Sequence, residues 1–136
     1  GVDVALRLYG RRHVDVDVTE ESGVVWRLTG VYGESAADRK KETWRTLKIL
    51  GQQHQDDRPW LCLGDFNEIL TVDEKIGGIA RPQQLMDNFR EALVHCELCD
   101  IGFEGDKFTW RNHSKELRTY ICERLDRAIA NEEWCT

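Results

Sequence analysis

Residues 60–67 have the sequence Trp60-Leu61-Cys62-Leu63-Gly64-Asp65-Phe66-Asn67, an apolar run that stops at a glycine followed by a carboxylate and a carboxamide. A short apolar run bounded by turn-forming residues is typical of a buried strand. Residues two apart on an extended chain point to the same side. We therefore expect Asp65 and Asn67 to face one site at the end of this strand.

This pair of side chains suits phosphoryl chemistry. A carboxylate such as Asp65 can bind a divalent cation or orient a water molecule. A carboxamide such as Asn67 can donate a hydrogen bond to a developing phosphorane oxygen. The alternative interpretation is a strand end followed by an Asx turn, because Gly, Asp and Asn all favour turns.

Length and composition indicate one globular domain. The chain has 136 residues, of which 40% are hydrophobic and 32% are charged. No apolar stretch approaches the ~20 residues that would span a bilayer, so we expect no membrane partner. The formal charge of −6, from 25 acidic and 19 basic side chains, argues against nucleic-acid binding through bulk charge alone. It is compatible with a metal-dependent phosphodiesterase, whose site must be acidic.

The five cysteines are odd in number and irregularly spaced, which argues against a disulfide framework and favours an intracellular, reducing compartment. A zinc site is the alternative, because Cys96 and Cys99 form a CxxC pair with His95, His113 and Cys122 nearby in the sequence. Only one such pair occurs, and a zinc site normally needs a second. Packing of Cys96 at the end of an amphipathic helix is the simpler interpretation.

Periodicity predicts the elements of the first half of the chain. Alternating apolar residues predict strands over 2–9 and 14–18, paired as an antiparallel hairpin, and a third strand over 24–32. Ser35 as an N-cap predicts a helix over 36–53.

The second half continues this alternation of strands and helices. Pro82 suits the first turn of a second helix, and Lys107 to Trp110 and Ile121 to Ile129 are predicted as strands. Asn131 is expected to cap a final short helix. Locally paired strands with helices between some of them indicate an α/β fold with mixed sheets, in a single unit.

Five motifs occur in order along the chain: Trp26-Arg27-Leu28-Thr29-Gly30-Val31-Tyr32-Gly33, Pro59-Trp60-Leu61-Cys62-Leu63-Gly64-Asp65-Phe66-Asn67-Glu68, Glu74-Lys75-Ile76-Gly77-Gly78, Phe108-Thr109-Trp110-Arg111-Asn112 and Glu123-Arg124-Leu125-Asp126-Arg127. This string resembles the endonuclease/exonuclease/phosphatase superfamily, and most closely the endonuclease domains of plant non-LTR (LINE-type) retrotransposons. The resemblance implies a four-layer α/β sandwich of the deoxyribonuclease-like type, of which residues 1–136 would be one partial domain.

The resemblance also implies roles for four residues. Tyr32 matches a tyrosine whose hydroxyl contacts the scissile phosphate. Asp65 matches the aspartate that orients or deprotonates the attacking water, and we expect it to contribute to the metal site. Asn67 matches an asparagine that stabilises the pentavalent phosphorus centre. Asp126 matches an aspartate that positions a catalytic histidine from further along the chain.

The same resemblance suggests cofactor, substrate and partners. Magnesium is the expected ion, with manganese as the alternative, because hard oxygen ligands suit a phosphate site. DNA is the expected substrate, with contacts from Lys75, Trp110 and Asn112. A reverse transcriptase domain would accompany this one in a parent polyprotein, and an enzyme acting on chromosomal DNA would be nuclear.

The expected reaction is magnesium-dependent hydrolysis of a DNA phosphodiester by an in-line water, leaving a 3′-hydroxyl. The superfamily's upstream metal-binding glutamate and its terminal Ser-Asp-His element match no part of residues 1–136. We therefore expect weak or no activity from this fragment. Two alternatives stay open: a non-catalytic remnant that binds nucleic acid or protein, and a phosphatase or lipid phosphodiesterase of the same superfamily.

Overall fold

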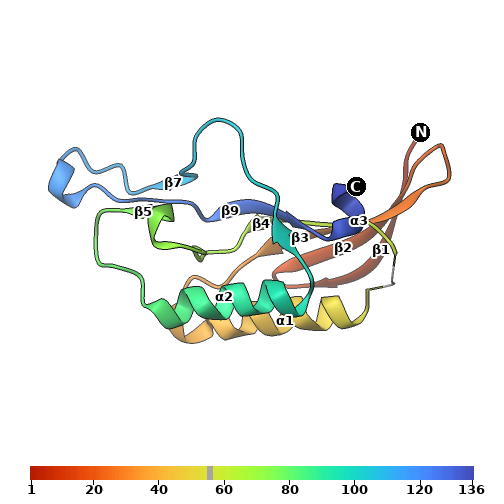
Figure 1. Cartoon of the computed structure of the whole chain (residues 1–136), viewed down its shortest axis with the longest axis horizontal. Coiled ribbons are helices and arrows are strands. Elements are labelled where there is room, and N and C mark those ends of the chain that lie inside the picture. Colours follow the sequence, from red (N-terminus) through yellow and green to blue (C-terminus); the bar gives the residue numbers. More distant parts are fainter. Residues whose placement is uncertain (55–56) are drawn as a thin grey trace.

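The computed structural model describes residues 1–54 and 57–136 (Figure 1). The strands are β1 (Asp3–Gly10), β2 (His13–Thr19), β3 (Val25–Tyr32), β4 (Trp60–Asp65), β5 (Lys75–Ile76), β6 (Cys99–Asp100), β7 (Trp110–Arg111), β8 (Cys122–Glu123) and β9 (Asp126–Ala130). The helices are α1 (Lys40–Gln52), α2 (Gln83–His95) and α3 (Glu132–Cys135), with 3-10 turns η1 (Ala37–Arg39), η2 (Val72–Glu74) and η3 (Leu117–Thr119).

Six strands form one mixed sheet in the order β1-β2-β3-β4-β9-β6. Strands β3 and β4 are parallel, and the other neighbours are antiparallel. A small second sheet has the order β5-β8-β7. The predicted mixed α/β fold and the predicted β1–β2 hairpin are therefore confirmed.

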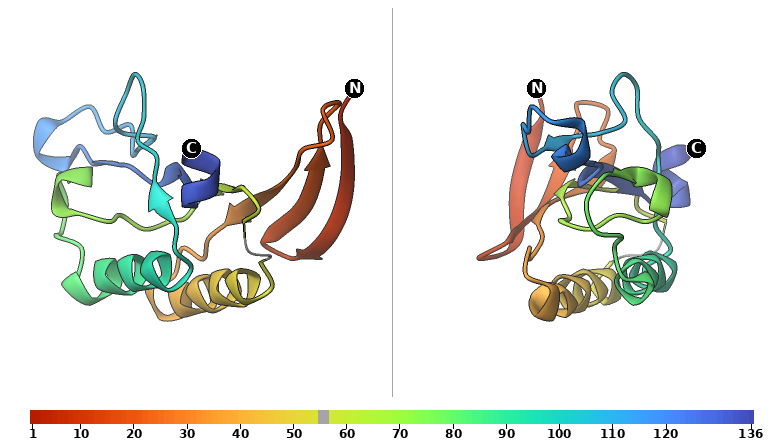
Figure 2. Two further views of the ribbon diagram at one scale, coloured as in Figure 1. Left: turned by 45° about the vertical axis from the view of Figure 1, so that its right-hand side comes forward. Right: turned by 90° about the vertical axis from the view of Figure 1, so that its left-hand side faces the viewer.

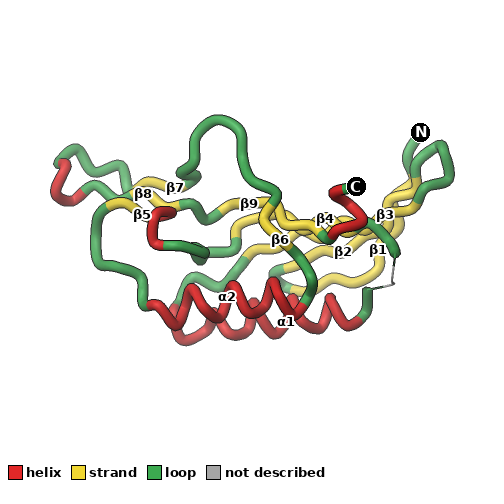
Figure 3. Tube along the Cα trace, in the orientation of Figure 1, coloured by secondary structure: helices red, strands yellow, loops and turns green. Residues whose placement is uncertain are grey.

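Helices α1 and α2 lie side by side on one face of the large sheet (Figures 1, 2 and 3). Between them and the sheet lies the main core, which contains the following buried side chains: Trp44, Leu47, Leu50, Trp60, Cys62, Phe66, Phe89, Ala92, Leu93, Leu98 and Ile129. Both helices thus bury an apolar face against the sheet. Among the described residues, no helix is long and apolar enough to cross a membrane.

A buried ion pair lies within this packed layer. Arg27 and Asp15 are both fully buried, and two guanidinium nitrogens each lie 2.8 Å from a carboxylate oxygen. Arg27 also donates to the Leu50 carbonyl at 2.9 Å and stacks on Trp60. Because each charge is paired and hydrogen-bonded, the cost of removing it from water is offset. The pair joins β2, β3 and the end of α1.

The opposite face of the large sheet is apolar yet exposed. Val4, Leu6, Val14 and Leu63 are all more than 40% accessible to solvent. Strand register places Tyr32 on this face too, because its neighbour Val31 packs against the core under the helices. One face of the sheet therefore builds the core, and the other presents side chains outward.

Three predictions of local structure were wrong. Ser35 does not cap α1, because the 3-10 turn η1 intervenes and neither η1 nor α1 has a side-chain cap. The predicted strand from Lys107 to Trp110 is replaced by the two-residue strand β7, which begins only at Trp110 and ends at Arg111. The predicted strand from Ile121 to Ile129 divides into β8 and β9, which belong to different sheets.

Hydrogen bonds from the backbone to Thr109 explain why the predicted strand divides into β8 and β9. The Thr109 hydroxyl accepts hydrogen bonds from the amides of Leu125 and Asp126, both at 3.0 Å. These bonds satisfy backbone groups that a continuous strand would satisfy by pairing with a neighbour. By contrast, Asn131 caps α3 as predicted, accepting from the Trp134 amide.

Gly64 allows β3 and β4 to approach each other. Its φ of 144° is a conformation that essentially only glycine adopts, and an added Cβ would lie 2.0 Å from the Val31 carbonyl oxygen. Any side chain here would push the two parallel strands apart at the end that carries Tyr32 and Asp65.

We expect Gly64→Ala to lower the free energy of unfolding by about 4 kcal/mol, because the change combines backbone strain with a collision against main chain. Gly30→Ala is the matched control, since a Cβ at this β3 position meets nothing within 4 Å; it should change stability by less than about 1 kcal/mol. Urea unfolding followed by circular dichroism would measure both. Equal effects would contradict this account of Gly64.

Candidate active site

Three predicted site residues lie on one rung of the large sheet. Tyr32 at the end of β3 pairs with Asp65 at the end of β4, and Asp65 pairs with Asp126 at the start of β9. Directly paired residues project to the same face, with adjacent strands about 4.8 Å apart. The structure therefore brings the phenol and the two carboxylates together on the outward face, at one end of three neighbouring strands.

Asn67 is held beside this rung by a sharp turn. Its φ is 53°, in the left-handed region that asparagine tolerates. Its backbone amide donates to the Asp65 carboxylate at 2.9 Å, and its side-chain nitrogen donates to the Gly33 carbonyl at 2.7 Å. The Asx turn, which the sequence presented as the alternative interpretation, is therefore observed. The expected extended path does not continue to Asn67, because β4 ends at Asp65, and a shared site for the two side chains stays a prediction.

Gly33 lets the chain after β3 pass close to the turn after β4. Its amide donates to the Asp65 carbonyl at 2.6 Å, and a Cβ on Gly33 would lie 2.4 Å from the Phe66 carbonyl oxygen. The site is thus built as much from backbone as from side chains.

Burial raises the pKa of the Asp65 carboxyl above its ordinary value. The hydrogen bond from the Asn67 amide opposes this rise, and the negative charge of Asp126 adds to it. A carboxylate with a raised pKa is a stronger base than an ordinary aspartate and has a greater need for a neighbouring cation.

Asp126 is held in place through its backbone. Thr109, just before β7, accepts from the Asp126 amide, while the Asp126 side chain is exposed. Thr109 lies in the Phe108–Asn112 motif, but no sequence pattern predicts its contact with Asp126, because the two residues are brought together only by the tertiary structure.

The three predicted substrate contacts lie on the small sheet or next to it. Lys75 is mostly buried, with its Nζ 3.2 Å from a Glu123 oxygen. Trp110 is exposed, and the Asn112 carboxamide is engaged with the loop that follows it, donating to the Thr119 carbonyl at 2.7 Å. None of the three belongs to the rung, and their contact with substrate stays a prediction.

Glu68 anchors the loop that begins at Asn67. Its carboxylate is fully buried, 3.1 Å from Lys40 Nζ and 3.2 Å from Arg81 Nε. Burial lowers the pKa of Lys40, although the Glu68 charge opposes this. The pair ties the start of α1 to the turn that carries Asn67.

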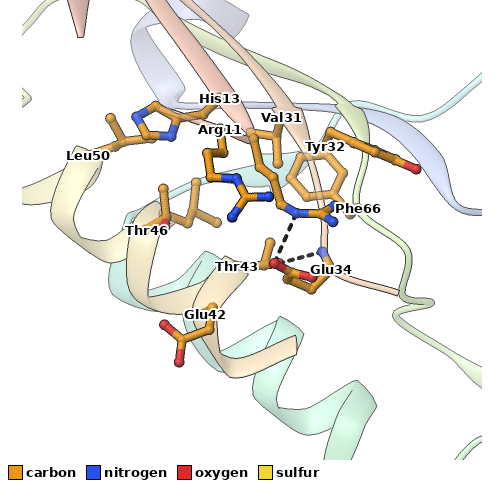
Figure 4. A pocket seen from close by; sticks show the side chains of 12 residues that line it. Arg11, His13, Val31, Tyr32, Glu34, Glu42, Thr43, Thr46, Leu50 and Phe66 are labelled. Atoms are coloured by element: carbon orange, nitrogen blue, oxygen red, sulfur yellow. Dashed lines mark hydrogen bonds and ion pairs between the residues drawn. The ribbon is translucent and has the colours of Figure 1, made fainter. Parts of the chain in front are cut away.

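A cavity of about 270 Å³ adjoins the rung on the helix side of the sheet. Its lining includes Val31, Leu50 and Phe66, with Arg12 among the charged side chains. Figure 4 shows the Tyr32 hydroxyl directed away from α1 and from this cavity. Tyr32 therefore contributes to the lining of the cavity, while its hydroxyl points outward.

Known proteins match this chain in structure. No family model and no curated protein matches it in sequence. The endonuclease domain of TRAS1, a telomere-specific non-LTR retrotransposon, superposes with a TM-score of 0.77 at 18% identity, over 97% of this chain and 57% of that one. An endonuclease/exonuclease/phosphatase family protein from Leptotrichia buccalis superposes with a TM-score of 0.61 at 15% identity, over 98% and 49% of the two chains.

The chain has the endonuclease/exonuclease/phosphatase fold. A beta toxin variant from Staphylococcus aureus with bound magnesium ions shares it, with a TM-score of 0.56 at 15% identity over 90% of this chain and 42% of the toxin. This chain therefore spans about half the length of the solved structures that it matches.

The carboxylate oxygens near the rung are ligands of the type that a hard divalent cation prefers. Asp65 and Asp126 supply two carboxylates on adjacent strands, and magnesium prefers oxygen ligands and retains several waters. Over residues 1–54 and 57–136, no group of three or more His, Cys, Asp and Glu side chains gathers as a metal site. The oxygen donors thus fit a divalent cation in chemical type, but the described residues do not form a complete metal site by themselves.

We expect Asp126→Asn to lower the pKa of Asp65, because a like charge is removed, while burial keeps that pKa above its ordinary value of 3.8. An NMR pH titration of the aspartate carboxyl carbons would measure the change. Asp87→Asn on α2 is the control and should leave Asp65 unchanged.

The raised pKa of Asp65 also makes the stability of the protein depend on pH. The folded protein holds the Asp65 proton more tightly than the unfolded chain, so the free energy of unfolding falls as pH rises from 3.8 through the raised value. Asp65→Asn removes this loss. The variant should therefore gain stability relative to the wild type across that window, and a constant difference would contradict the assignment.

Proposed function

We propose that this chain carries part of the active site of a divalent-cation-dependent DNA endonuclease, which hydrolyses a phosphodiester bond by in-line attack of water. The observation that supports this most is the rung of Tyr32, Asp65 and Asp126, with Asn67 beside it. A phenol, two carboxylates and a carboxamide on one exposed edge provide donors and a base without a covalent nucleophile. Phosphodiester hydrolysis needs preorganised donors and a place for a cation, and this set can supply both.

Each side chain has a proposed role that its contacts permit. Asp65, whose pKa is raised, orients the water and accepts its proton. The Asn67 carboxamide has two N–H donors; one binds the Gly33 carbonyl, and the other is available to a phosphoryl oxygen. The exposed Tyr32 hydroxyl donates to the same phosphate. Asp126 would orient an imidazole.

Magnesium, with manganese as the alternative, is the proposed cofactor. Asp65 would hold it, with Asp126 on the neighbouring strand as a second oxygen donor. When bound, the ion would neutralise charge that develops on the phosphoryl oxygens. It would also relieve the repulsion between the two carboxylates, which adds to the effect of burial in raising the pKa of Asp65.

DNA is the proposed substrate because the TRAS1 neighbour is an endonuclease domain of a retrotransposon. By the same analogy, a reverse transcriptase domain would accompany this one in a parent polyprotein, and the protein would act in the nucleus. The net charge of −6 indicates that local contacts at the site, rather than overall charge, hold the DNA.

A plasmid-nicking assay with magnesium tests this proposal. We expect slow nicking of supercoiled plasmid by the wild type, slower than by the TRAS1 endonuclease domain. Asp65→Asn and Asn67→Ala should each reduce the rate by about 10²–10³-fold, the usual effect of removing a preorganised group from such a site. Chelation of the metal should stop the reaction.

Substitutions away from the rung serve as controls. Asp87→Asn on α2 should nick at the wild-type rate. Equal rates for the wild type and Asp65→Asn would refute the proposal. Binding of DNA without nicking would favour a non-catalytic remnant, and hydrolysis of a phosphomonoester or a phospholipid in place of DNA would favour the phosphatase or lipid phosphodiesterase alternative.

A further inference from the structure

Arg12, in the turn between β1 and β2, contacts three consecutive residues at the end of β3. Its guanidinium carbon lies 4.9 Å from the centre of the Tyr32 ring. One terminal nitrogen donates to the Gly33 carbonyl at 3.1 Å, and Nε lies 2.9 Å from a Glu34 oxygen. The Tyr32 amide in turn donates to the Arg12 carbonyl at 2.8 Å. No motif in the sequence analysis included Arg12.

The Gly33 carbonyl links this arginine to the other side of the site. It accepts from Arg12 at 3.1 Å and from the Asn67 carboxamide at 2.7 Å. A carbonyl oxygen has two lone pairs, so both bonds can form together. The Gly33 carbonyl therefore helps to orient the Asn67 side chain directly, and the Tyr32 ring through Arg12.

Tyr32 needs such a support because it projects from the sheet. Its side chain is 57% exposed. A guanidinium lying against the ring restricts it through a cation–π contact. Glu34, which pairs with Arg12, is itself fixed because its amide donates to the Thr43 hydroxyl on α1 at 2.9 Å. A line of contacts thus runs from α1 through Glu34 and Arg12 to Tyr32.

We propose that Arg12 is a positioning residue of this site, which fixes the Tyr32 phenol and the Asn67 carboxamide relative to each other. This inference rests on the proposed phosphodiesterase function. Arg12 acts through geometry rather than net charge, because Glu34 neutralises it at 2.9 Å. Lysine is not equivalent, since a point charge on a flexible stem cannot lie flat on a ring while donating to two acceptors.

The test compares Arg12→Gln and Arg12→Lys with the wild type in two assays. NMR of the whole chain would follow the ring order of Tyr32 and the solvent exchange of the Asn67 side-chain amide. Both variants should loosen the Tyr32 ring, because its cation–π contact is lost. They should also speed the exchange of the Asn67 amide about five-fold, because the Gly33 carbonyl that it binds loses the hydrogen bond that holds it from the other side. In plasmid nicking, kcat should fall by a similar factor while KM stays within about two-fold.

Arg39→Gln is the matched control. Arg39 also pairs with Glu34, at 3.7 Å, and its side chain is 61% exposed. Within the described part of the chain, no hydrogen bond, ion pair or cation–π contact joins it to Tyr32 or Gly33. It should leave both NMR readouts and kcat at wild-type values.

Three results separate the outcomes. Wild-type ring order and amide exchange in Arg12→Gln would overturn the proposal. So would full recovery by Arg12→Lys, which would assign Arg12 a role through charge alone. A wild-type protein that does not nick DNA would refute the proposed function, yet the NMR comparison would still decide whether Arg12 positions Tyr32 and Asn67.

Discussion

The structure depends on the close parallel approach of β3 and β4 at Gly64. A backbone with φ of 144° lies so near the Val31 carbonyl that no side chain fits between them. This approach sets the register that pairs Tyr32 with Asp65, and the next pairing adds Asp126. A shift of one residue would turn one of these side chains toward the helices. The candidate site is thus a consequence of strand register.

Buried charges then fix the surroundings of the rung. Arg127, next to Asp126, points inward and lies 2.8 Å from oxygens of both Glu74 and Asp100. It ties β9 to η2 and to the edge strand β6, while Asp126 faces outward. Breaking such a buried pair is costly, because a charge would be left without a partner. These pairs therefore hold Asp126 in register while its own carboxylate remains available.

Much of the site is formed by backbone and by residues with no chemistry of their own. The Gly33 carbonyl orients Asn67, the Thr109 hydroxyl holds the Asp126 amide, and Arg12 lies on the Tyr32 ring. These contacts hold the polar groups at the ends of β3, β4 and β9 in place before any ligand binds. Groups ordered in advance need not be ordered during a reaction.

Local periodicity and turn chemistry are enough to predict the hairpin, the two amphipathic helices, the mixed α/β class and the turn at Asp65 and Asn67. They do not predict the break between β8 and β9 or the short strand β6, since these depend on contacts between residues far apart in the chain, such as Thr109 with Asp126. Strand order and register are set by packing rather than by any local pattern. For this reason the sequence did not show that Tyr32, Asp65 and Asp126 share a rung or that Arg12 lies against the Tyr32 ring.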